Sequence, residues 1–294
     1  MKSIHNHIKT LYDQGTPLFT RCELQSLIAQ LDNLQDKGFK ERKIHLTGMN
    51  KVVVDIPIET GKVALENETS TTGCEIISTV QYKHLRSGKI FHVSILKQRI
   101  FQSKSTTTFA IDKSQEWEAS EQNRYLQDTL LSVPSFVIIN KVIGFACGSL
   151  TFGTEIHRRS AIQHALLSSL RNYLFKIKES VQIQCYTQDP EYSFNEKQAL
   201  KAIGIIALDD PKAFLEVDDA SIVISIGPDI PVKQIITDIA RPAAIIWCKQ
   251  REEIYYMADP MSPRVQGMLS TEYIELDFPY HESIGDVALY FRKG

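Results

Sequence analysis

The sequence lacks the features that mark membrane-spanning, disulfide-bonded and zinc-binding proteins. No apolar run in the 294 residues approaches the roughly 20 that a helix needs to cross a bilayer, and the amino-terminal stretch is polar from its start. The five cysteines lie far apart without a CxxC pair, so neither a zinc site nor a disulfide framework is indicated. We therefore expect a cytoplasmic or nuclear protein with free, buried thiols and no membrane partner.

A surplus of positive charge is also missing. The chain has 33 Lys and Arg residues against 35 Asp and Glu residues, a net charge of −2. Broad binding to nucleic acid depends on neutralising many phosphates, so we expect no DNA partner. With 43% hydrophobic and 23% charged residues, the composition excludes collagen-like, coiled-coil and wholly disordered chains.

The first third of the chain mixes helix and strand signals. Thr20 and Glu23 have the spacing of a capping box, and Gly38 offers a left-handed stop, which together predict a helix of about 17 residues. Three segments rich in β-branched residues follow, and they predict strands that pair as antiparallel hairpins. These segments are residues 51–58, 74–82 and 89–96. We predict an α+β extension over residues 1–112.

Residues 113–294 are predicted to form an α/β domain. Residues 114–131 have helical spacing, and from about residue 136 apolar strand segments alternate with helical ones. The strand segments are residues 136–146, 181–189, 205–210, 221–229 and 243–249, followed by edge or terminal strands at 273–279 and 286–292. Asn195 and Gly204 are placed to begin and end one of the helices. The alternation predicts a Rossmann-like, mostly parallel sheet flanked by helices.

Oxygen-bearing side chains follow four of these strands where each one ends. They are Ser149, Asp189, Asp209, Asp210 and Asp229. Ligands of open parallel sheets bind beyond the carboxyl ends of the strands, so these side chains are candidates for one crevice that holds a small molecule. Aspartate is also a common turn former and helix cap, and Asp189 and Asp210 each precede a proline.

The glycines near Ser149 leave two further interpretations open. Gly144, Gly148 and Gly153 do not reproduce GxGxxG, yet a glycine turn with Asp189 after the next strand is compatible with a nucleotide or S-adenosylmethionine site. A nucleophilic serine would need a base or an anion hole, which backbone amides at the start of the next helix could supply. His157 and His164 lie on that helix, where a surface histidine is usually just solvated. HExxH is absent, so no metal is expected.

The segment after Ser149 carries a local surplus of positive charge. Between Glu155 and Glu179 there are five basic residues and two acidic ones. The basic residues are Arg158, Arg159, Arg171, Lys176 and Lys178. Such a surplus is typical of a solvated helix face, and it also suits a patch that contacts phosphates.

Several segments between residues 142 and 279 resemble the "sensitivity to red light reduced" (SRR-type) domain family in its fungal form. They include IGFACGSL, SAIQHALLSSL, QDPEYSFNEKQALKAIGI, LDDPKAFLEVDDASIVISIGPDIPVKQIITDIARPAAII, SPRVQGM and YIELDFP. One fungal branch of this family consists of arginine-containing cyclodipeptide synthases. Those enzymes use aminoacyl-tRNAs and resemble bacterial synthases whose serine follows the first strand of a Rossmann-like domain.

The resemblance implies a role for each candidate residue. Ser149 would accept the first aminoacyl group, and the acidic residues Asp189, Asp209, Asp210 or Asp229 would bind a guanidinium group. Arg158, Arg159, Lys176 and Lys178 would contact tRNA phosphates. No cofactor or metal is implied. The DDxxE motif expected of the synthase branch is replaced here by DDPKA and DDASI, so a regulatory protein that binds an effector without catalysis remains an alternative.

Overall fold

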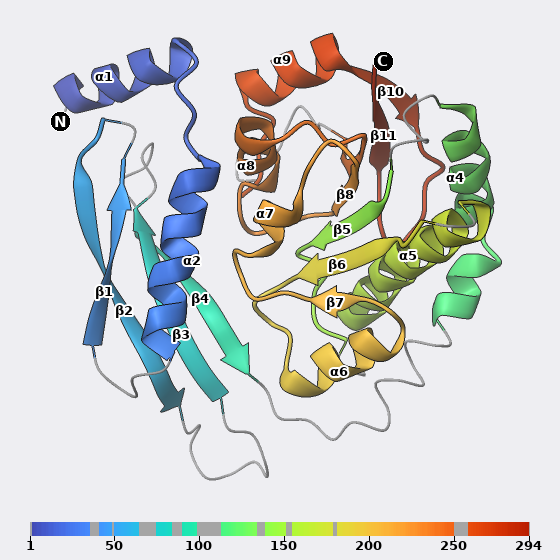
Figure 1. Ribbon diagram of the computed structural model, residues 1–294, viewed down its shortest axis with the longest axis horizontal. Coiled ribbons are helices and arrows are strands. Elements are labelled where there is room, and N and C mark those ends of the chain that lie inside the picture. The colour runs from blue at the N-terminus through green and yellow to red at the C-terminus, as the bar shows by residue number, and fades with distance from the viewer. Residues whose placement is uncertain are drawn as a thin grey trace. The chain divides into compact units, whose positions relative to one another are not determined.

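The computed structural model describes most of the chain as two compact units (Figure 1). The described residues are 2–35, 41–48, 50–64, 75–83, 90–98, 113–133, 139–150, 155–178, 181–249 and 258–293. The units are Met1–Ile100 and Phe101–Gly294. The predicted boundary between residues 112 and 113 falls at the end of a segment, 99–112, that lies outside the described residues.

The smaller unit contains an antiparallel sheet in the order β1-β2-β3-β4. Its elements are α1 (Lys2–Asp13), α2 (Arg21–Gln35), β1 (Glu41–Thr47), β2 (Val53–Ala64), β3 (Glu75–Lys83) and β4 (Ile90–Gln98). The predicted strands and their antiparallel pairing are confirmed. The capping pair is also confirmed, since Thr20 Oγ1 accepts from the Glu23 amide and donates to the Glu23 carboxylate. Gly38 lies outside the described residues, and α1 and β1 were not predicted.

The larger unit is built on a seven-stranded sheet in the order β10-β11-β9-β8-β5-β6-β7. Its strands are β5 (Lys141–Phe145), β6 (Gln184–Gln188), β7 (Ile206–Ala207), β8 (Ser221–Ser225), β9 (Ala244–Cys248), β10 (Tyr273–Asp277) and β11 (Val287–Arg292). The strands β5 to β9 are parallel, whereas β10 and β11 are antiparallel to their neighbours. The predicted α/β class with a mostly parallel sheet is confirmed.

Helices cover both faces of this sheet (Figure 1). They are α4 (Glu121–Ser132), α5 (Glu155–Ile177), α6 (Phe194–Ala202), α7 (Ala213–Glu216), α8 (Val232–Ile239) and α9 (Pro263–Glu272). On one face, the buried Val142 and Ile222 join a core with residues of α4 and α5. On the other, Trp247 packs with residues of α9, and Phe145 stacks on Phe214 of α7 at 4.4 Å between ring centroids. Strand side chains therefore alternate between two cores, as expected for a sheet covered on both sides.

Three predicted elements differ from the structure. The helix predicted over 114–131 is interrupted, because α4 has its own beginning at Ser120, whose side chain accepts from the Asn123 amide. The helix α6 begins at Ser193 rather than Asn195, because Ser193 and Glu196 cap each other reciprocally. Gly204 does follow its end, at φ +83°. The strand predicted at 205–210 is only two residues long, and its pairing with β6 ends where Leu208 donates to Thr187.

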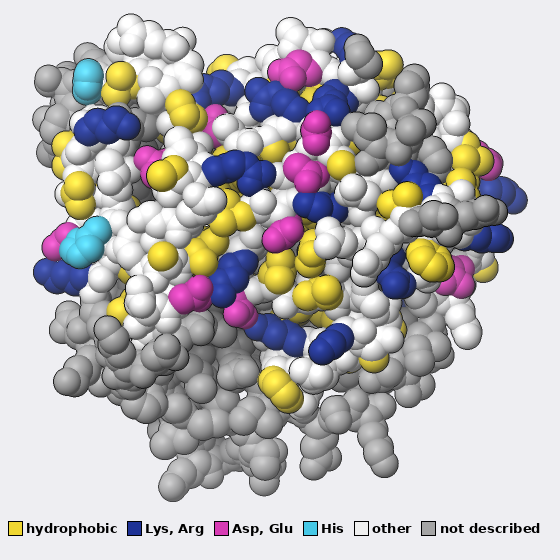
Figure 2. Space-filling view, in the orientation of Figure 1, with side chains coloured by type: hydrophobic (Ala, Val, Ile, Leu, Met, Phe, Trp, Pro, Cys, Tyr) yellow, Lys and Arg dark blue, Asp and Glu magenta, His cyan; other side chains and the backbone are white. Residues whose placement is uncertain are grey.

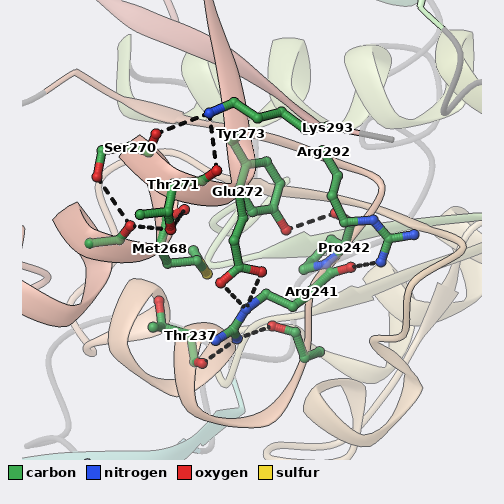
Figure 3. Close-up of polar contacts among 12 residues, drawn as sticks. Thr237, Arg241, Pro242, Met268, Ser270, Thr271, Glu272, Tyr273, Arg292 and Lys293 are labelled. Carbon is green, nitrogen blue, oxygen red and sulfur yellow. Dashed lines mark hydrogen bonds and ion pairs between the residues drawn. The ribbon is translucent and has the colours of Figure 1, made fainter.

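A group of hydrogen bonds and ion pairs lies where the parallel strands of the larger sheet begin, beside the first residues of β9 (Figure 3). Arg241 donates from Nε to both carboxylate oxygens of Glu272, at 3.0 and 2.9 Å, and from Nη1 to the Thr237 carbonyl at 2.6 Å. Arg292 Nη1 donates to the Arg241 carbonyl at 2.7 Å, and the Tyr273 hydroxyl donates to the Pro242 carbonyl at 2.8 Å. These contacts join α8, α9 and β11 at one edge, opposite the strand ends where a ligand is expected.

Candidate functional site

The strand order places the loops after β5, β6 and β8 next to one another. The chain runs from β5 outward through β6 to β7 and then returns to β8 on the other side of β5. Ligands of such sheets bind at this reversal point. The loop after β5 has an unusual backbone, with Ala146 at φ +54° and Gly148 at φ +77°. A non-glycine residue in the left-handed region is uncommon, and such positions concentrate at functional sites.

Glycine is required at position 148. A Cβ there would lie 2.3 Å from Ser160 Oγ, in addition to the positive φ. The Gly148 amide donates to Asp189 Oδ2 at 2.8 Å. This bond joins the loop that carries Ser149 to the end of β6, so the structure brings these two predicted site residues together.

Ser149 is held by a glutamate that the sequence reasoning missed. Its hydroxyl donates to Glu196 Oε1 at 2.6 Å, and the Leu150 amide donates to the same oxygen at 2.6 Å. The other oxygen, Oε2, accepts from the Ser193 amide and hydroxyl at 2.8 and 2.6 Å. Glu196 is buried, and these four bonds fix its carboxylate. The spacing of Ser193 and Glu196, which is that of a capping box, was the available signal.

A neutral, buried hydrogen-bonded chain lies behind this loop. His164 Nδ1 pairs with the Ser160 carbonyl at 2.6 Å, so Nδ1 carries the hydrogen and Nε2 accepts from the Tyr192 hydroxyl at 2.6 Å. The Tyr192 oxygen in turn lies 2.8 Å from Thr187 Oγ1. Burial lowers the pKa of His164 to about 4. The interpretation of His164 as a solvated surface histidine is therefore wrong.

Two of the predicted aspartates lie in surroundings that favour protonation. Burial raises the pKa of Asp189 to about 6, against the hydrogen bonds from the Glu191 and Gly148 amides, which lower it. Burial, and then the negative charge of Asp189, raise the pKa of Asp210 to about 6. Gln188 donates to Asp210 Oδ1 at 2.7 Å, at the end of β6. These two carboxyl groups can exchange protons close to neutral pH.

The other two predicted aspartates are placed differently. Asp209 is exposed and forms an ion pair of 2.6 Å with Lys197. Asp229 is exposed and lines a hollow of about 210 Å³ beyond the ends of β8 and β9, which we call the β8–β9 hollow. Its lining is Gly227, Pro228, Asp229, Lys233, Cys248, Ala258 and Asp259. Lys233 and Asp259 form a buried ion pair of 3.0 Å there. Ser149 does not line this hollow.

The four predicted phosphate-binding cations do not form one patch. Arg158 is paired with Glu116 and Glu282, and Lys178 Nζ donates to the Ile139 carbonyl at 2.5 Å. Arg159 and Lys176 are exposed but 17 residues apart on α5, which is about 25 Å along the axis. On the visible face, lysine and arginine side chains alternate with aspartate and glutamate (Figure 2).

No cluster of three or more histidine, cysteine, aspartate or glutamate side chains is arranged to hold a metal ion among the described residues. No helix in the described part of the chain has the length and apolar character needed to cross a membrane.

Comparison with known proteins identifies the family of the central region. Residues 126–265 match the family model of the SRR1 domain. The matched region runs from α4 to the first residues of α9 and includes all five parallel strands and the Ser149 loop. No curated protein matches the chain. The sequence of residues 126–265 therefore matches an SRR1 domain, and this stretch lies within the larger of the two units.

Proposed function

We propose that this protein is a cyclodipeptide synthase that uses aminoacyl-tRNAs and carries the first aminoacyl group as an ester of Ser149. The observation that carries the proposal is the 2.6 Å hydrogen bond from Ser149 Oγ to the buried carboxylate of Glu196, at the end of the first parallel strand. A fixed acceptor beside a serine hydroxyl is what an activated nucleophile requires. The resemblance to the fungal branch of the SRR-type family supports the choice of substrate.

The proposed reaction has three bond-forming steps. Ser149 Oγ attacks the ester carbonyl of the first aminoacyl-tRNA and passes its proton to Glu196, and the tRNA hydroxyl leaves with a proton. The amine of a second aminoacyl-tRNA then attacks the seryl ester, and the Ser149 oxygen leaves and regains a proton. Finally, the free amine of the dipeptide attacks the ester that joins it to the second tRNA, which closes the ring and releases that tRNA.

The acidic residues suit a cationic substrate side chain. Among the predicted aspartates, Asp209 is already paired with Lys197, whereas Asp229 is exposed beside a hollow. We therefore assign the binding of a guanidinium group first to Asp229, with Asp189 and Asp210 exchanging protons during the acyl transfers. Arg159 and Lys176, which are exposed, are the cations available for tRNA phosphates.

The test is product formation from a full set of aminoacyl-tRNAs. Purified protein should yield a diketopiperazine by mass spectrometry, and intact-mass analysis should show an aminoacyl adduct on Ser149. Ser149→Ala should abolish both signals, and Ser270→Ala should keep them, since Ser270 is an exposed residue of α9 whose hydroxyl donates only to its own helix. Wild-type protein that gives neither product nor adduct would refute the proposal.

A second candidate function is non-catalytic binding of a small effector. It is favoured by the β8–β9 hollow, which Ser149 does not line. A thermal-shift screen with amino acids, nucleotides, S-adenosylmethionine and haem distinguishes the two functions. Stabilisation that Asp229→Asn removes and Ser149→Ala leaves intact, without turnover, supports this candidate. Turnover of a nucleotide or of S-adenosylmethionine would instead indicate the transferase alternative.

A further inference from the structure

A second and larger hollow lies between α5, the end of α6 and the helical residues 113–118, and we call it the α5–α6 hollow. Its volume is about 530 Å³, which is within the range of small-molecule sites. Its charged lining residues are Arg171, Lys201 and Glu118, and polar side chains from Ser114, Ser168 and Asn172 complete much of the wall. Neither Ser149 nor any predicted aspartate lines it.

The guanidinium of Arg171 is held in a defined position in this hollow. A Cβ on Gly204 would lie 2.7 Å from Arg171 Nη1 and 2.8 Å from its Cζ, so the guanidinium rests against the glycine backbone. Arg171 Nη1 also donates to Asn172 Oδ1 at 3.0 Å. Because an arginine has five N–H donors, most of them stay available to a ligand.

Arg171 and Lys201 are the two cations of the hollow. Among the described residues, no carboxylate lies within ion-pair distance of either of them. Glu118 is exposed and forms no ion pair with either of them. With two cations and one anion, the charged lining has a net charge of +1. Two other cations on these elements are paired, Arg158 with Glu116 and Lys197 with Asp209.

We propose that the α5–α6 hollow binds a small molecule through its phosphate group. A preorganised arginine fork next to a lysine matches the geometry and double negative charge of a phosphate monoester, and hydroxyl and amide donors line the same wall. A concave site of this volume suits a compact phosphorylated ligand better than a nucleic-acid backbone, which is bound along grooves or faces. The site is independent of the chemistry proposed for Ser149.

Calorimetric titration of the whole protein tests this proposal, with inorganic phosphate and adenosine monophosphate as probes in a phosphate-free buffer. Wild type should bind at least one probe, and Arg171→Gln should weaken binding about tenfold or more, because it removes a charge-assisted contact. Lys201→Gln should weaken it to a smaller degree. Glu118→Gln should tighten it, because repulsion of the anion is relieved.

Arg124→Gln is the matched control. It removes one positive charge from an exposed residue of α4 that does not line the hollow, and it should bind the probes as wild type does. Equal affinities of wild type and Arg171→Gln would overturn the proposal, as would the absence of binding by wild type. Binding of a tRNA but of neither small probe would overturn it too, and would indicate a nucleic-acid surface instead. Thermal melts of each variant verify that it is folded.

Discussion

Several ionisable residues of the site lie in buried surroundings that disfavour their charged forms. His164 is buried and neutral, and the carboxyl groups of Asp189 and Asp210 are shifted toward protonation. Glu196 is buried as well, and it accepts four hydrogen bonds that hold its carboxylate next to Ser149. Sequence reasoning selected Ser149 and Asp189 from their positions at strand ends but missed Glu196, which lies inside a helix.

The titration of His164 predicts a pH-dependent stability. Its pKa in the folded protein is about 4, below the value of 6.5 for a free histidine, so the unfolded chain binds the proton more tightly. Neutral His164 contributes about 3 kcal/mol to the free energy of unfolding. This contribution is fully present above pH 6.5 and is lost as the pH falls toward 4. His164→Gln should be less stable at pH 7 and should lose less stability than wild type between pH 7 and pH 4.5.

Urea unfolding of both proteins at several pH values measures this effect. Asp189 and Asp210 act in the opposite direction, because their raised pKa values make the folded protein bind protons more tightly between pH 6 and pH 4. Their contribution is common to both proteins, so the difference between wild type and variant isolates His164. Parallel stability curves would show that His164 is not the titrating group.

At the scale of elements, the short loop after β5 has a conformation set by contacts with α5. Gly148 packs against Ser160 in the first turns of α5, and its amide reaches Asp189 after β6. The sequence identified a glycine turn here, but no pattern near residue 148 reveals that Ser160 occupies the space of a side chain. The start of α6 could not be predicted from the sequence either, because both Ser193 and Asn195 are good capping residues. Only the hydrogen bonds between Ser193 and Glu196 show that the helix begins at Ser193.

Gly148→Ala should therefore destabilise the protein for two separable reasons. A left-handed alanine costs about 1–2 kcal/mol, and the new Cβ also collides with Ser160 Oγ. Adding Ser160→Ala should recover the second part of the loss and leave the first. Gly227→Ala is a matched control, since Gly227 has φ +67° with no atom within 4 Å of its Cβ position, and it should show the backbone cost alone. Chemical denaturation measures the stability of all three variants. Equal losses of stability for Gly148→Ala and Gly227→Ala would show that the new Cβ does not collide with Ser160.

At the scale of the whole molecule, the folded unit extends beyond the family match. The match ends at residue 265, yet β11 pairs with β9 and contributes five consecutive buried side chains, from Val287 to Phe291. Three of them, Val287, Leu289 and Phe291, belong to the larger core, and the other two, Ala288 and Tyr290, belong to the core that contains Trp247. The antiparallel strands thus complete both cores of the parallel sheet.

A chain that ends at residue 265 should fail to fold stably. Loss of β11 removes side chains that each contribute about 1.5–3 kcal/mol when buried, a sum comparable to the whole stability of a typical domain. Circular dichroism and thermal melts of residues 113–265 and 113–294 measure the difference, the longer fragment being the control. A cooperative transition of the shorter fragment within a few degrees of the longer one would show that β10 and β11 are dispensable.

The alternation of strands and helices, the mostly parallel sheet and several helix ends could be predicted from local sequence patterns, because periodicity and capping act over a few neighbouring residues. The side chains that meet in the site could not be predicted in this way. Ser149 contacts Glu196 across 47 positions, and Gly148 contacts Asp189 across 41, whereas Asp229 lies at a separate hollow. Strand order and the close packing of helices on the sheet set these encounters, and both depend on contacts between segments that are distant in the chain.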